Sequence, residues 1–473
     1  MKMNKTAMAV ALAFPLLANA QSSAQLQSQI EALKAQVQQL EALVKQKVAS
    51  DEAPVELEEF NRIKTKVEAA EDIAEASGFK GLRVTGGLDP AYVWNSAKGI
   101  STFSFGNPLA NSNNANNELY TYDNSYFGAA YIDFQKEMEG GSKMRLTLMP
   151  EKSVGSGITS SSIIQEASAS IPLSDAQTRL MVGQMGDVSG YEPTLNTYTG
   201  ANNVSSNQLY PGYAEYFITK NMLFDFTAAN FYTGAGIDMI RGPWEYKFWL
   251  ANFNSNRTNV ASSNAAADTR ASEPAFIYNA TYAQEEFWGF EFTGYEAHVG
   301  TPQGPLGRLD QFEIDGNYTR GDFNGNLQFT VGRLENGAFD GSGDSRWWGF
   351  SALASEKVGA NWVLAGRLDY LNNQANGGGL FTITNNVGGT SASYGDVING
   401  FGAGDPNAAG YDATVGANRT SLSGAATYRL NRNVAFRGEL RRDFSTKPTF
   451  YNYGNGSFQS ANTTIGLQTI VNF

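Results

Sequence analysis

The sequence predicts an all-β transmembrane barrel of about 16 antiparallel strands, closed on itself and preceded by an N-terminal helical coiled-coil segment. Three observations lead to this fold class. Apolar and polar residues alternate through many short segments over residues 79–473. The connections between these segments are short and long in turn. The last segment keeps the alternation up to the terminal residue, Phe473.

Residues 462–473 show the alternation most clearly. The apolar residues of one parity are Ile465, Leu467, Val471 and Phe473. The other parity is mostly polar, and Ile470 is the one exception. Because side chains of a strand point alternately to its two faces, one face is apolar and the other is mostly polar. An edge strand of a soluble sandwich has the same alternation, so this segment alone leaves both folds open.

Composition excludes several classes of protein. The chain has 473 residues, no cysteine and a mean hydropathy of -0.33. A helical membrane protein needs apolar runs of about 20 residues, whereas a transmembrane barrel hides its hydrophobicity by alternation. Without cysteine there is no disulfide framework or thiolate metal site, and we expect neither a metal nor a cofactor. The net charge of -12 and the pI near 4.8 argue against a nucleic-acid partner.

Residues 1–20 are typical of a secretory signal peptide. Lys2 and Lys5 give a positive start, residues 7–17 are apolar, and Ala18 and Ala20 form a cleavage site. The apolar run is too short for a membrane anchor. The sequence therefore predicts an exported protein.

Residues 21–50 predict a coiled coil. Apolar residues recur there at spacings of 4, 3, 4, 3 and 4, at Leu26, Ile30, Leu33, Val37, Leu40 and Val44. This near-heptad repeat favours association between helices, and alternating Leu with β-branched residues favours two strands. A solvated helix on the rim of the barrel is the alternative. Residues 51–78 then predict a helical linker, with the helix over residues 55–76.

Strands are expected along the whole of residues 79–473. Their predicted ranges are 80–95, 123–138, 143–152, 162–172, 176–186, 234–242, 243–254, 275–285, 287–299, 308–319, 326–335, 345–358, 361–372, 419–430, 434–445 and 460–473. Among the connections, 139–142 and 431–433 are short, whereas 187–233 and 373–418 are long. An even number of strands places both ends of the barrel on one side of the membrane.

The two faces of these strands differ in polarity. In 434–445, Arg437, Glu439, Arg441 and Asp443 share the inward parity, and Val434, Phe436, Gly438 and Leu440 share the outward parity. Burying both signs of charge in a packed soluble core would be costly, so this face suits a water-filled lumen. Aromatic girdles are expected near strand ends, at Trp244, Tyr246, Phe248, Trp288, Trp347, Trp348 and Trp362.

The signal peptide, the strand number, the large loops and the terminal Phe473 resemble the general and substrate-selective porins of proteobacteria, over residues 79–473. The coiled coil, followed by residues 59–71 and 78–84, resembles a porin-like family with a coiled-coil N-terminus. The resemblance implies a bacterial outer-membrane location among outer-membrane lipid, a periplasmic linker at 51–78, a homotrimer, and a channel for small hydrophilic solutes or ions. The alternative is a structural barrel with a plugged lumen, whose coiled coil holds the trimer or engages the cell wall.

In such porins the third outer loop folds into the barrel and narrows it. The resemblance assigns this constriction to residues 187–233, which are rich in aromatic residues for a solvated loop. The candidate constriction residues are Glu192, Tyr210, Tyr213, Phe217, Asp225 and Tyr232. The acidic residues of this segment are spread out rather than clustered, which departs from those porins. Its aromatic residues either form a path for sugars or simply pack against the wall.

By parity, a set of charged residues faces the lumen. The candidate pore-lining residues are Arg145, Arg179, Arg367, Asp369, Arg429, Arg437, Glu439 and Arg441. The arginines either form a positive track that steers anions, or are neutralised by inward carboxylates to give a mixed-charge lumen. Both interpretations stay open at this point.

An enzyme is the least favoured interpretation. Any Ser-His-acid site would have to use the only histidine, His298, which lies at an outer strand end. No serine partner is evident, so we expect no catalytic residue, and a barrel hydrolase remains only an unfavoured alternative.

Overall fold

The computed structural model describes residues 61–66, 69, 81–97, 100–104, 130–149, 164–192, 216–228, 231–254, 274–284, 287–300, 306–338, 343–375, 402–405, 407–452 and 455–473. The chain divides into two compact units, residues 1–80 and 81–473. In the first unit, residues 61–66 are helical, within the predicted linker helix. The predicted signal peptide and coiled coil lie outside the described residues. No helix in the described part is long and apolar enough to cross a membrane.

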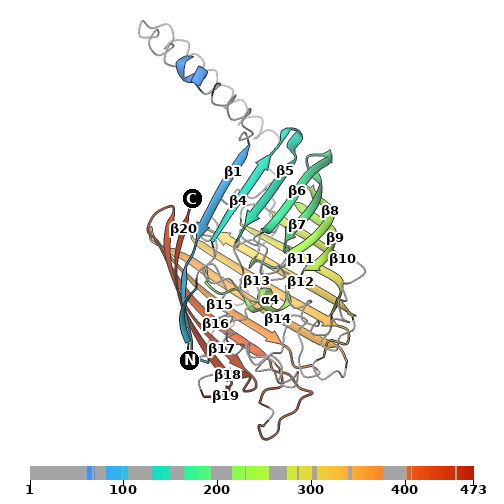
Figure 1. The fold of residues 1–473 in the computed structure, drawn as a ribbon, viewed down its shortest axis with the longest axis vertical. Coiled ribbons are helices and arrows are strands. Elements are labelled where there is room, and N and C mark those ends of the chain that lie inside the picture. Colours follow the sequence, from blue (N-terminus) through green and yellow to red (C-terminus); the bar gives the residue numbers. More distant parts are fainter. Residues whose placement is uncertain are drawn as a thin grey trace, which may run out of the picture. The chain divides into compact units, whose positions relative to one another are not determined.

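The second unit contains one antiparallel sheet of 18 strands that forms a ring (Figure 1). Its strands are β1 (Leu82–Leu88), β2 (Ala91–Asn95), β3 (Ile100–Ser104), β4 (Ala130–Glu137), β5 (Lys143–Leu148), β6 (Ile164–Asp175), β7 (Thr178–Gly186), β8 (Phe231–Arg241), β9 (Trp244–Asn254), β10 (Ala275–Gln284), β11 (Trp288–Gly300), β12 (Leu306–Arg320), β13 (Phe323–Leu334), β14 (Ser345–Val358), β15 (Trp362–Asn372), β16 (Arg419–Arg429), β17 (Val434–Ser445) and β20 (Ala461–Asn472). Strands β1 and β2 are successive parts of one barrel position, and β3 and β4 pair with those two parts. The 18 strands therefore fill 16 positions, as the sequence predicts.

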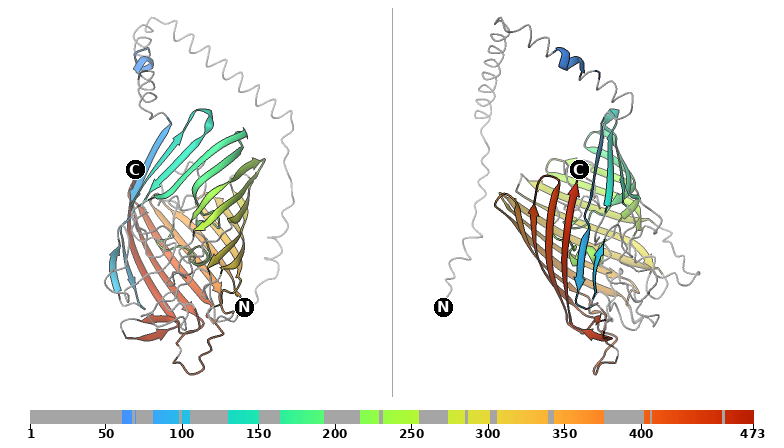
Figure 2. Two further views of the ribbon diagram at one scale, coloured as in Figure 1. Left: turned by 45° about the vertical axis from the view of Figure 1, so that its right-hand side comes forward. Right: turned by 60° about the vertical axis from the view of Figure 1, so that its left-hand side comes forward.

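The final strand closes the barrel. Strand β20 pairs with β17 on one side and with β1 and β2 on the other, where Gly87 faces Asn472 and Ala91 faces Gln468. Figure 2 shows the first and last strands side by side. The ring of strands consequently leaves no open seam between β17 and β1, which removes the unpaired edge that a soluble sheet would have.

The burial of alternate residues confirms the predicted faces. Along β20, Asn462, Thr464 and Gln468 are buried, while Ile465 and Leu467 are exposed. Strand β17 shows the same alternation, with buried Arg437, Glu439, Arg441 and Asp443. The barrel thus has an apolar outer face and a polar inner face, the reverse of a soluble protein.

One aromatic residue departs from the predicted girdle. Trp347 on β14 is only 1% exposed and faces inward, whereas its neighbour Trp348 is 41% exposed and faces outward. Trp347 packs over Gly332, where an added Cβ would lie 2.2 Å from the indole ring. The period of two requires this outcome, because adjacent residues of a strand cannot share a face.

Other differences from the sequence prediction are local. The predicted strand 80–95 breaks at Asp89 and Pro90, because proline has no backbone N–H to donate to the ladder. Strand β3 extends the ring within a predicted loop, and a separate hairpin of β18 (Phe450–Asn452) and β19 (Ser457–Gln459) lies within another. A short 3-10 turn, η1 (Glu139–Gly141), joins β4 to β5.

The main apolar core of the described residues lies inside the barrel. The short helix α4 (Met222–Thr227) is completely buried and contacts β14 and β15. Its Met222, Leu223 and Phe226 belong to one cluster with inward side chains of the wall, including Trp249 and Tyr295. The connection between β7 and β8 therefore enters the barrel and packs there.

Candidate functional site

The connection between β7 and β8 lies against the inner wall in two described parts, residues 187–192 and 216–228. Asn221 starts helix α4, because its side chain accepts a hydrogen bond from the backbone N of Phe224 at 2.8 Å. The same side chain donates to Gln328 on β13 at 3.0 Å. A single residue therefore begins the helix and ties it to the wall.

The carboxylate of Glu439 on β17 holds the chain just before this helix. It accepts hydrogen bonds from the backbone N of Ile218 at 2.6 Å and of Thr219 at 2.8 Å, and from the Thr219 hydroxyl at 2.6 Å. All three residues are buried. Backbone groups that water cannot reach need such partners, so Glu439 satisfies the N–H groups that this segment brings into the barrel.

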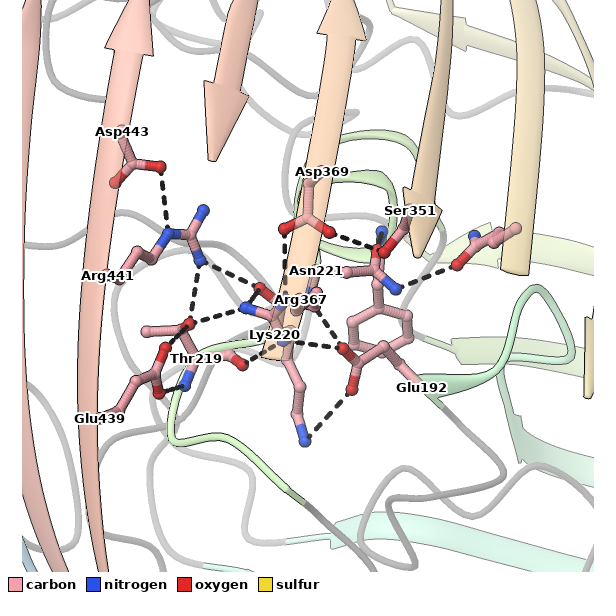
Figure 3. A network of polar contacts seen from close by, with 12 residues as sticks. Glu192, Thr219, Lys220, Asn221, Ser351, Arg367, Asp369, Glu439, Arg441 and Asp443 are labelled. Carbon is pink, nitrogen blue, oxygen red and sulfur yellow. Dashed lines mark hydrogen bonds and ion pairs between the residues drawn. The ribbon is translucent and has the colours of Figure 1, made fainter. Parts of the chain in front are cut away.

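Three arginines of the wall hold the backbone carbonyls of the same segment. Arg367 on β15 donates to the carbonyl of Thr219 at 2.8 Å and to that of Lys220 at 2.9 Å. Arg441 donates to the carbonyl of Lys220 at 3.1 Å, and Arg437 to that of Phe217 at 3.2 Å. Together with Glu439 they make a clamp around residues 217–220, part of which Figure 3 shows.

The clamp is neutralised by carboxylates around it. Arg367 lies 3.4 Å from Glu192 and 3.2 Å from Asp369, and Arg441 lies 3.1 Å from Asp443 (Figure 3). All of these side chains are almost fully buried. The arginines therefore do not form an exposed positive track, because the segment and the carboxylates cover them.

An acidic group of side chains lies on another part of the inner wall. Glu291 on β11 faces Asp315 on β12 in the register, and Glu313 is the next inward residue of β12. Glu313 accepts hydrogen bonds from Gln328 at 2.8 Å and from Thr330 at 2.6 Å. Neighbouring carboxylates repel one another, so this acidic group does not stabilise the fold. The inner wall consequently carries acidic residues on β11 and β12 and residues of both charge signs on β15 and β17.

Asp187 begins the connection after β7. Its carboxylate accepts hydrogen bonds from the backbone N of Val188, from the Ser189 hydroxyl and from the Tyr232 hydroxyl, at 2.8, 2.6 and 2.8 Å. Burial raises the pKa of Asp187 to about 7, although these hydrogen bonds favour the charged form. Its charge therefore changes near neutral pH.

The structure places the predicted site residues in several separate locations. Arg367, Asp369, Arg437, Glu439 and Arg441 come together around residues 217–220. Arg145 lies apart on β5, 2.9 Å from Asp133 and 3.3 Å from Glu166. Arg179 donates to Ser170 at 2.6 Å, and Arg429 ends β16. The sequence had grouped these arginines by parity alone, which does not tell how far apart they lie.

The predicted constriction residues also differ in their surroundings. Glu192 and Phe217 lie at the clamp, where the guanidinium of Arg367 stacks over the Phe217 ring at 4.5 Å. Asp225 is buried in α4. Tyr232 is not a loop residue, since it belongs to β8, where its side chain is buried. Tyr210 and Tyr213 lie outside the described residues.

Several residues of the site were missed by the sequence analysis. Thr219, Lys220, Asn221, Gln328 and Ser351 carry polar contacts of the clamp and its surroundings. Only Asn221 had a local signal, an Asn directly before an apolar run, which is typical of a helix N-cap. His298, the candidate for catalysis, is exposed on β11 opposite Arg308. Within the described ranges, no group of three or more His, Asp or Glu residues is placed to hold a metal ion.

A closed ring of 16 strand positions, apolar outside and charged inside, defines a porin-type β-barrel of the bacterial outer membrane. A protein-family profile described as "Protein of unknown function (DUF3138)" matches residues 47–285 and 289–473. The chain belongs to this family. No curated protein sequence matches it.

Solved structures of outer-membrane proteins resemble the barrel. An anion-selective porin from Comamonas acidovorans is 12% identical at a TM-score of 0.48, with 83% of this chain and 99% of that chain covered. The outer membrane channel DcaP of Acinetobacter baumannii is 10% identical at a TM-score of 0.47, with 83% and 98% covered. OmpF of Salmonella typhi, solved with daunomycin, is 12% identical at a TM-score of 0.46, with 83% and 97% covered.

Proposed function

We propose that this protein is an outer-membrane channel for passive diffusion of small hydrophilic solutes or ions, narrowed by the connection between β7 and β8. The observation that carries the proposal is the charge on the inner face. Charged side chains occur on the inner faces of β4, β5, β6, β11, β12, β15, β16 and β17. Placing charges away from bulk water is costly, so a barrel that served only as an anchor would gain nothing from them.

Selectivity in this proposal comes from pore width and from the acidic side chains of β11 and β12. The acidic residues of β11 and β12 would favour cations in the narrowed region, because the arginines of β15 and β17 lie beside carboxylates. In contrast to the pattern that the resemblance implies, the acidic side is supplied by the wall rather than by the folded-in loop. Arg367, Arg437 and Arg441 hold the loop in place, through the carbonyls of residues 217–220.

The second candidate is a structural barrel whose lumen is filled. The complete burial of α4 and of the clamp favours it, because both fill space inside the barrel. In this case the predicted coiled coil would hold copies together or engage the cell wall. A homotrimer, which the resemblance to porins implies, belongs to both proposals.

Conductance in planar lipid bilayers separates the two candidates. The purified protein should give steady steps of current in salt solution if it is a channel, and no steps if the lumen is filled. Reversal potentials in a salt gradient should then move toward cation selectivity when Arg437 is changed to Gln. If the folded protein gives no current steps at any voltage, the channel proposal is wrong.

A further inference from the structure

A groove on the outer face of the barrel lies outside the proposed channel. It encloses about 610 Å³ next to β11, β12, β13 and β14. Its polar side includes Glu296, Asp310, Arg333 and Arg346, and its apolar side includes Phe312 and Trp348. These side chains are exposed or half-buried and have the opposite parity to Gln311 and Trp347, two buried residues that also border the groove.

The charged side chains form a row across neighbouring strands. In the register, Glu296 faces Asp310, Asp310 faces Arg333, and Arg333 faces Arg346. The next outward residues toward the middle of the strands are apolar, at Phe312, Val331 and Trp348. The row therefore lies where the apolar outer belt ends, which is the level of lipid headgroups.

The strand ends identify the leaflet. The row lies at the ends of strands joined by the connections 335–344 and 373–418, whereas the opposite ends are joined by short turns such as 321–322 and 359–361. In barrels of this class the longer connections are extracellular. The groove thus faces the outer leaflet.

Charge within the row is uneven. Arg333 and Arg346 are direct cross-strand neighbours and share the carboxylate of Asp344, at 2.8 and 3.7 Å. Arg308 lies between Glu296 and Asp310, at 3.3 and 2.8 Å. Over the whole row the three guanidinium groups are balanced by Glu296, Asp310 and Asp344, but two of the three guanidinium groups lie together at the Arg333 and Arg346 end. Like charges directly opposite each other are unfavourable in a sheet unless an anion compensates them.

We propose that this groove binds the phosphate-bearing headgroup of an outer-leaflet lipid. The phosphate lies between Arg333 and Arg346, whose planar guanidinium groups suit phosphate oxygens. The upper part of an acyl chain lies along Phe312, Val331 and Trp348. The adjacent guanidinium groups of Arg333 and Arg346 and the adjoining apolar strip together select an anionic amphiphile over a soluble anion.

Native mass spectrometry of the detergent-solubilised protein tests the proposal with three probes. Phosphatidic acid carries a phosphate and two acyl chains, diacylglycerol has the chains alone, and inorganic phosphate has the anion alone. We expect phosphatidic acid to bind, and the double change Arg333→Gln with Arg346→Gln to weaken it by about tenfold or more, since charge-assisted hydrogen bonds are lost. The matched control is Arg442→Gln, an exposed outward arginine on β17 outside the groove.

Three outcomes would overturn the proposal. Equal binding of diacylglycerol would show that the phosphate is not recognised, and equal binding of inorganic phosphate would show that no lipid is required. Unchanged binding by the double variant would place the lipid elsewhere. If the double variant does not fold, the single change Arg346→Gln replaces it. The Arg346 side chain is 68% exposed, and its contact with Asp344 is long, at 3.7 Å, so this change should not disturb folding. We expect these variants to conduct as the unaltered protein does, because the groove lies outside the proposed channel.

Discussion

Glu439 and Thr219 are joined by two hydrogen bonds, from the Thr219 backbone N at 2.8 Å and from its hydroxyl at 2.6 Å. One residue belongs to the barrel wall and the other to the connection that fills part of the lumen. Because both are buried, the bonds replace water for groups that would otherwise be unsatisfied. The position of residues 217–220 therefore depends on the charge of one wall residue.

Changing Glu439 to Gln should release this segment. An amide keeps one acceptor but turns an NH2 group toward the chain, so at least one charge-assisted bond is lost, worth about 1.5–3 kcal/mol. Lys220 is buried, so trypsin reaches it only when the segment opens. We expect cleavage after Lys220 to become about tenfold faster or more, measured by fragment analysis of the folded protein. The exposed Glu356→Gln serves as control, and equal cleavage in both variants would refute the role of Glu439.

Arg367 and Asp369 should behave as a coupled pair. Changing Arg367 to Gln leaves the carboxylates of Asp369 and Glu192 buried without their guanidinium partner, which should lower the free energy of unfolding by about 3–5 kcal/mol. Adding Asp369→Asn should recover part of this loss. Urea unfolding in detergent measures both. Arg241→Gln is the control, since its pair with Asp175 at 3.7 Å is exposed and screened by water. Additive effects in the double variant would contradict the coupling.

Parity explains why these wall residues could be predicted and their partners could not. Alternation is a property of each strand, so the sequence placed Arg437, Glu439 and Arg441 on the inner face of β17 without knowledge of the fold. The contact between Thr219 and Glu439 spans 220 residues of sequence. Nothing in the local sequence shows that these two residues meet, because the path of the connection depends on side chains of β15 and β17 together. The burial of α4 on all sides follows from the same non-local packing.

The charge of Asp187 should make stability depend on pH. Burial raises its pKa to about 7, above the usual value of 3.8, so the folded protein holds a proton that the unfolded chain releases. Stability should therefore be highest below pH 4, fall as pH rises from about 4 to 7, and be level above that. The total change is about 4 kcal/mol at most.

Asp187→Asn tests this dependence, because the amide oxygen can still accept from the Val188 backbone N and the Tyr232 hydroxyl, and the amide NH2 can donate to the Ser189 hydroxyl, without a charge. We expect its unfolding midpoint to change less between pH 5 and pH 8 than that of the unaltered protein. The control is Asp322→Asn, in an exposed turn. If the unfolding midpoint of the Asp187 variant depends on pH as strongly as that of the unaltered protein, another group causes the dependence.

Gly349 on β14 lies close against helix α4 of the connection. A Cβ added there would lie 2.5 Å from a methyl group of Leu223 in α4 and 2.6 Å from the backbone oxygen of Tyr370. Since the backbone oxygen cannot move aside easily, Gly349→Ala should destabilise the protein by about 1–3 kcal/mol. The unfolding temperature in detergent measures this change. Gly424 on β16 is the matched control, because nothing lies within 4 Å of its added Cβ, and Gly424→Ala should be neutral or slightly stabilising. If both variants unfold at the same temperature, α4 does not pack against β14.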